Sequence, residues 1–132
     1  MAYRFEFDPV NKILLMRFEG RLTNESAVEF YEACWKYAAA TDASAGIVDF
    51  SSATEFAVSS EILRQLARQK SALPNATRRP RVVVAPQTHA FGLFRMFQIV
   101  GEDTRPLLQV VHTMDEALAA LGVQSPHFDP LE

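Results

Sequence analysis

The pattern of hydrophobic positions at the start of the chain predicts two paired strands. Residues 3–8 alternate between apolar and polar side chains, which is typical of a strand with one buried face. Residues 12–20 are apolar on both faces, so they predict an interior strand. Asp8 and Pro9 stand between them at the first two positions of a type I turn. We therefore expect an antiparallel hairpin.

Apolar residues three or four positions apart predict two helices in the next part of the chain. The first helix has Thr23 as its N-cap and continues to about Ala40, with Cys34 on its apolar face. The second begins near Ser59 or Ser60. Its inward side chains are expected to be Ile62, Leu63, Leu66 and Leu73.

The same spacing predicts two more helices further along. Residues 88–100 form the third, and Thr113 with Glu116 is a capping box that starts the fourth. Gly122 is a stop signal for that last helix.

Three short apolar runs lie between these helices and predict buried strands. They cover residues 45–50, 81–86 and 107–113, and the first is expected to end in a turn at Ser51 and Ser52. A hairpin followed by three strand–helix units predicts an α/β fold, with a mixed sheet that is parallel in its later part and flanked by about four helices. We expect one domain over residues 1–122 and an extended surface tail over residues 123–132.

Composition agrees with a folded domain and adds a charge asymmetry. Of the 132 residues, 48% are hydrophobic and 22% are charged. Residues 61–100 have a formal charge of +6, whereas the rest of the chain has −9. Such a distribution steers an anionic partner to one face. Net acidity and the lack of interleaved exposed aromatic residues argue against a nucleic-acid partner.

The sequence also predicts the compartment. Cys34 is the one cysteine, so it has no partner for an intramolecular disulfide and fits a reducing compartment. Its place on an apolar helix face makes it core filler rather than a nucleophile. No signal-peptide core and no transmembrane segment are recognisable, so we expect a cytoplasmic protein.

Catalytic and cofactor motifs are not apparent. The histidines His89, His112 and His127 lack partners at ligand spacing, so no metal is expected. No glycine-rich phosphate loop or nucleophile elbow occurs, and we expect no cofactor and no enzyme activity. Asp49, at the end of a buried strand, is the most enzyme-like residue and supports only a third-ranked hypothesis.

Three stretches of sequence resemble a known family. "RFEGRLTNE", "IVDFSSATEF" and "HAFGLFRMF" are similar to the SpoIIAA-like, STAS/SEC14-type family of small bacterial proteins. The segment "GIVDFSSATEFAVSSEILRQLAR" resembles the central part of STAS domains, the fold of bacterial anti-sigma-factor antagonists. The resemblance covers nearly the whole chain to about Leu121 and implies a STAS-like sheet.

The same resemblance points to two serines. Ser60 matches the serine that a partner kinase phosphorylates in the antagonists, and Ser59 matches the serine before it. Val58 and Glu61 stand where that motif has Asp and Gly. The resemblance thus implies a regulatory site at a helix start, and the alternative is that both serines only cap the helix.

The helix at 88–100 carries more apolar side chains than one buried face requires. Ala90, Leu93, Phe94, Phe97 and Val100 form the inward arc. Phe91, Met96 and Ile99 lie at the rim or outside it, with Arg95 between them. We interpret these four residues as a docking surface; cover by a neighbouring element is the alternative.

Two functions follow as hypotheses. The first is a non-enzymatic regulatory module that binds a protein partner or a second copy of itself through residues 88–100 and the Ser59–Ser60 helix start. The alternative is a binder of a small apolar or anionic, lipid-like ligand, with Arg64, Arg68 or Arg95 holding its anionic group. A pocket above about 300 Å³ between the third helix and the sheet would favour the ligand.

Overall fold

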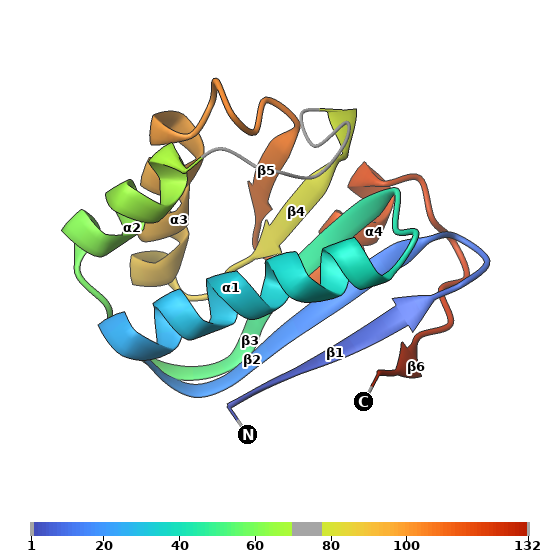
Figure 1. Cartoon of the computed structure of the whole chain (residues 1–132), viewed down its shortest axis with the longest axis horizontal. Coiled ribbons are helices and arrows are strands. Elements are labelled where there is room, and N and C mark those ends of the chain that lie inside the picture. Colours follow the sequence, from blue (N-terminus) through green and yellow to red (C-terminus); the bar gives the residue numbers. More distant parts are fainter. Residues whose placement is uncertain (1, 70–77, 132) are drawn as a thin grey trace.

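The computed structural model describes residues 2–69 and 78–131, which form one mixed sheet with helices on both faces (Figure 1). The elements, in chain order, are β1 (Tyr3–Asp8), β2 (Ile13–Thr23), α1 (Asn24–Ala40), β3 (Ala45–Ala57), α2 (Ser60–Arg68), β4 (Arg81–Val84), α3 (Thr88–Val100), β5 (Leu108–Val111), α4 (Met114–Ala120) and β6 (Asp129–Pro130).

The sheet confirms the predicted α/β architecture. Its six strands lie in the order β5-β4-β3-β2-β1-β6. Strands β1 and β2 pair antiparallel, and β2 to β5 are parallel neighbours in turn. Each parallel step crosses over through a helix, as parallel pairing requires.

The helix starts and stops also follow the predicted signals. Thr23 caps α1 by accepting a hydrogen bond from the Ser26 backbone N–H. Thr113 caps α4, and Gly122 follows that helix with a positive φ of 71°. Leu73, predicted to point inward from the second helix, lies outside the described residues.

The predicted turn at Ser51 and Ser52 is wrong. Both serines are strand residues, because β3 is 13 residues long and runs to Ala57 beside the 11-residue β2. The pairing shifts register at two places in β2, between Arg17 and Glu19 and between Gly20 and Arg21. These irregularities allow a long, bent strand pair in place of a turn.

The tail adds a strand that the sequence did not predict. Strand β6 pairs antiparallel with β1, and the Leu131 backbone N–H donates to the Phe5 carbonyl oxygen. Residue His127 donates its backbone N–H to the buried carboxylate of Asp8 at 3.1 Å. The tail is therefore fastened to the edge of the sheet.

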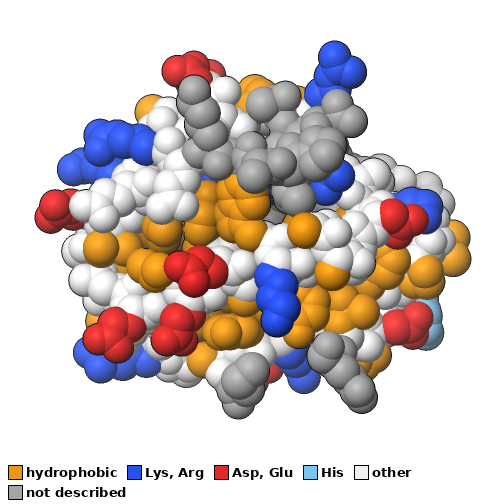
Figure 2. Space-filling model, in the orientation of Figure 1, with side chains coloured by type: hydrophobic (Ala, Val, Ile, Leu, Met, Phe, Trp, Pro, Cys, Tyr) orange, Lys and Arg blue, Asp and Glu red, His pale blue; other side chains and the backbone are white. Residues whose placement is uncertain are grey.

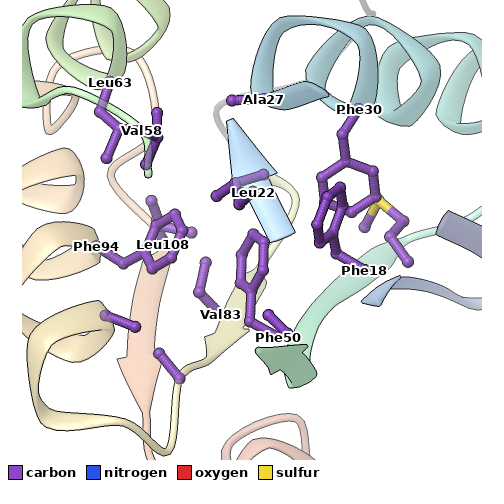
Figure 3. Packing of buried hydrophobic residues seen from close by; sticks show 14 of the residues in the cluster. Phe18, Leu22, Ala27, Phe30, Phe50, Val58, Leu63, Val83, Phe94 and Leu108 are labelled. Carbon is purple, nitrogen blue, oxygen red and sulfur yellow. The ribbon is translucent and has the colours of Figure 1, made fainter. Parts of the chain in front are cut away.

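Two hydrophobic clusters lie on opposite faces of the sheet. Helices α1, α2 and α3 cover the larger cluster, where the rings of Phe18 and Phe30 are 5.3 Å apart and those of Phe50 and Phe94 stack at 4.4 Å (Figure 3). Helix α4 covers the smaller cluster through Ala117. The larger cluster separates the sheet from three helices, and every site described below lies on that side or along its rim.

Candidate functional site

The start of α2 places the two candidate serines at an exposed point of the molecule. Ser59 is the N-cap, and its hydroxyl oxygen accepts from the Ile62 backbone N–H at 3.2 Å. The backbone N–H of Ser59 donates to the side-chain oxygen of Asn24 at 2.7 Å, which ties this corner to the start of α1. Ser60 is the first helical residue and is exposed. Ser59 thus has a capping role, and Ser60 is accessible.

The predicted docking residues of α3 differ in exposure. Ile99 is 63% exposed, and Arg95 is exposed with its Nη1 donating to the Gln98 Oε1 at 2.6 Å. Phe91 is half-buried and stacks on the imidazole of His112, with ring centroids 4.0 Å apart. Met96 is half-buried against the larger cluster. The helix thus has an outer ridge at Phe91, Arg95 and Ile99, four residues apart.

The predicted anion-binding arginines are all on the outside. Arg64 and Arg68 are exposed on α2, and Arg95 is exposed on α3, which packs against α2. None of the three lines the apolar cavity between the sheet and helices α1, α2 and α3. They are available to an anion that docks on the helices, and a ligand inside the protein would meet other side chains.

A cavity of about 150 Å³ lies between the sheet and helices α1, α2 and α3. Its walls are almost entirely apolar and include Phe30 and Trp35 of α1, Leu63 of α2 and Phe97 of α3. Hydrophobic side chains reach the molecular surface between α1 and α2 (Figure 2). The volume is about half of the 300 Å³ expected for a typical ligand site, so only a small molecule fits.

Three arginines that the sequence analysis did not single out line this cavity. They are Arg79, Arg81 and Arg105. Arg81 begins β4 and pairs in register with Leu108 of β5, three residues after Arg105. The three side chains therefore gather at the amino ends of β4 and β5.

Arg105 is the most buried of the three, at 6% exposure. Its guanidinium donates to the backbone carbonyl oxygens of Leu66, Ala67 and Gln69 and to the Tyr31 hydroxyl. It also lies 5.2 Å from the ring centroid of Phe97. Burial lowers the pKa of Arg105, which fits a cation without an ion-pair partner among the described residues.

The sequence signal for this basic group was limited to the net positive charge of residues 61–100, which include Arg79 and Arg81 but not Arg105. Arg79 and Arg81 stand in a loop and at a strand start, where solvated arginines are common, and Arg105 lies in an irregular segment between α3 and β5. Tyr31 is 74 residues away from Arg105 in the chain. Only the folded arrangement brings these side chains to one cavity.

Asp49 does not end a strand, contrary to the prediction. It lies within β3, and its Oδ1 accepts from the Ser51 backbone N–H at 2.9 Å. This bond lies where the pairing of β3 with β2 shifts register, between the Arg17–Asp49 and Glu19–Ser52 pairs. In the described part of the chain, no cluster of His, Cys, Asp or Glu is arranged to hold a metal ion. No helix over residues 2–69 and 78–131 is long and apolar enough to span a membrane.

The comparisons with known proteins bear on the fold. No family model and no curated protein match this chain. The solved structure of the anti-sigma factor antagonist SpoIIAA in its unphosphorylated form matches with a TM-score of 0.57 and 13% identity, over 94% of this chain and all of that one. The phosphorylated form of the Bacillus cell fate determinant SpoIIAA matches with a TM-score of 0.49 and 19% identity, over 89% and 97% of the two chains. The chain thus has the STAS-like α/β fold of SpoIIAA, as the sequence resemblance implied.

Proposed function

We propose that this chain is a non-enzymatic regulatory module that binds a protein partner through the outer ridge of α3 and the start of α2. The observation that carries the proposal is the exposure of Ile99 on a helix that packs against α2, the helix that presents Ser60. An exposed apolar side chain at the centre of a polar rim is a common anchor for a partner.

A phosphate on Ser60 would control such docking by charge. The N-terminus of a helix favours an anion, because its free N–H groups and its dipole attract negative charge. Arg64 follows Ser60 by four residues and so lies on the same face of α2. Phosphorylation adds a charge of about −2 there, which would change the attraction of a charged partner. SpoIIAA, which shares this fold, has been solved in an unphosphorylated form.

Matched exposed substitutions test the docking surface. Ile99→Ser and Val10→Ser both remove an exposed apolar side chain, and Val10 lies in the turn after β1, in another part of the fold. A protein captured by the wild-type chain from a lysate of the source cell is purified and titrated calorimetrically; we expect Ile99→Ser to bind it at least tenfold more weakly and Val10→Ser to bind it as wild type does. Equal affinities for the two variants would refute the ridge as the docking surface. Light scattering on the same variants shows whether the partner is a second copy of the chain.

Phosphorylation is tested in the source cell by intact mass. We expect one phosphate on the wild-type chain and on Ser59→Ala, and none on Ser60→Ala. A phosphate that persists on Ser60→Ala would remove Ser60 as the regulatory residue.

A second candidate function is binding of a small ligand. The cavity is smaller than the roughly 300 Å³ that would favour a lipid-like ligand, but its apolar walls and its arginines favour a smaller anionic one.

A further inference from the structure

We propose that the cavity under α1, α2 and α3 binds a small carboxylate with an apolar body of about six carbon atoms, its carboxylate group facing Arg79 and Arg81. The inference deepens the second candidate function and rests on it. Its residues differ from the exposed arginines that the sequence singled out for an anion.

The shape of the cavity sets the size of the apolar body. The volume of about 150 Å³ is lined mainly by apolar side chains, among them leucine, phenylalanine, tryptophan and alanine, and it is partly open to solvent. An apolar cavity of about this size in a protein core is known to take up benzene, which has about six carbons. A short alkyl chain or one ring therefore fits, whereas a two-chain lipid does not.

The charge at one end of the cavity sets the polar group. Arg79, Arg81 and Arg105 line that end, and no described carboxylate lies within ion-pair distance of any of them. Residues 70–77, between α2 and Arg78, contain no Asp or Glu in their sequence. Partly buried positive charges without a counter-ion are costly, and a bound anion relieves that cost.

The three arginines differ in the contacts that their side chains make. Arg105 donates its hydrogen bonds to backbone carbonyl oxygens and to the Tyr31 hydroxyl. It therefore adds positive charge to the cavity and links α1 to the end of α2. Arg79 and Arg81 also line the cavity and form no ion pair with a described carboxylate, and their planar guanidinium groups match the geometry of a carboxylate. Burial, followed by the neighbouring charge of Arg79, lowers the pKa of Arg81.

The wall of the cavity contains a built-in reporter. Trp35 is the one tryptophan of the chain and lines the cavity, as does Cys34. A ligand in the cavity changes the surroundings of the indole, so tryptophan fluorescence follows binding to the unmodified protein without a label.

The experiment titrates the full chain with heptanoate, heptan-1-ol and acetate. We expect heptanoate to change Trp35 fluorescence saturably, with an affinity at least tenfold above that of heptan-1-ol, while acetate gives no change. Arg81→Gln should lose this tenfold preference for the acid and still bind the alcohol. Arg68→Gln, on the exposed face of α2, is the matched control and should behave as wild type.

A cavity-filling variant separates binding inside from binding outside. Cys34→Leu places a larger side chain in the cavity wall, so it should weaken heptanoate and heptan-1-ol alike by at least tenfold. Equal affinity for acid and alcohol in the wild type, no saturable signal at millimolar heptanoate, or equal losses in Arg81→Gln and Arg68→Gln would each overturn the proposal. Ile99→Ser should leave heptanoate binding unchanged, so failure of the docking surface and failure of the cavity are told apart.

Discussion

On the α4 side of the sheet, small and branched side chains fill the space between strands and helix. Ile13, Leu15, Ile47, Val82 and Val84 pack there against Ala117. On the opposite side, β2 and β3 present the larger side chains Phe18 and Phe50, and β1 adds Phe5. Three helices cover these rings, and the 150 Å³ cavity lies among them.

The difference shows how one sheet serves two purposes. Adjacent residues of a strand point to opposite faces, so β2 supplies Ile13 and Leu15 to one cluster and Leu14, Met16 and Phe18 to the other. Small branched side chains allow one short helix to pack closely. Bulky rings and three separate helices meet less completely, and the remaining space is available to a ligand. The proposed ligand site therefore lies on the side of the sheet that α1, α2 and α3 cover.

The largest expected effect on stability comes from removing the ring of Phe18 from the larger cluster. Phe18 has no exposed surface and packs beside Phe30 and Phe50. Phe18→Ala should lower the free energy of unfolding by about 3–5 kcal/mol, because it removes buried apolar area and leaves a void. Urea denaturation measures the change, and Val10→Ala, 84% exposed, should stay within about 0.5 kcal/mol of wild type. Similar losses for both variants would contradict the aromatic cluster as the main core.

Added volume should distinguish the two faces. Ala117→Leu inserts carbon atoms into the fully buried centre of the α4 cluster and should cost about 1–3 kcal/mol through overpacking. Cys34→Leu adds volume where the cavity offers space, so its loss in unfolding free energy should be smaller than that of Ala117→Leu. Thermal denaturation of both variants makes the comparison. A larger loss of unfolding free energy in Cys34→Leu than in Ala117→Leu would show that the cavity has no room for the added carbon atoms.

The features that the sequence predicted correctly are those with local signals. The hairpin, the helix at Asn24–Ala40 and the capped helix at Met114–Ala120 were predicted because their signals are local: alternation, helical spacing and capping residues. The parallel direction of the later strands followed from the helical crossovers. Local physics therefore determines most of the fold.

The features that were missed depend on partners distant in the chain. Ser51 and Ser52 resemble a turn locally, and only the long partner strand β2 keeps them extended. Arg81 and Arg105 become a pair of cavity residues only after β4 and β5 align. The predicted docking residues on α3 follow from helical spacing, but their degree of exposure depends on neighbours such as His112.

The smallest expected effect concerns the tail, which contributes Phe128 to the α4 cluster and Leu131 to the opposite one. Burial raises the pKa of Asp8, but hydrogen bonds from the Asn11 side chain and from the backbone N–H groups of Asn11, His127 and Val10 outweigh it and lower the pKa to about 2. Ionised Asp8 therefore stabilises the fold above its ordinary pKa of 3.8, and this contribution is lost as the pH falls through about 2. Asp8→Asn should remove that share of the acid dependence of urea unfolding and speed hydrogen exchange at the Leu131 amide, which donates to Phe5. An unchanged acid dependence in Asp8→Asn would mean that this carboxylate does not hold the tail against the edge of the sheet.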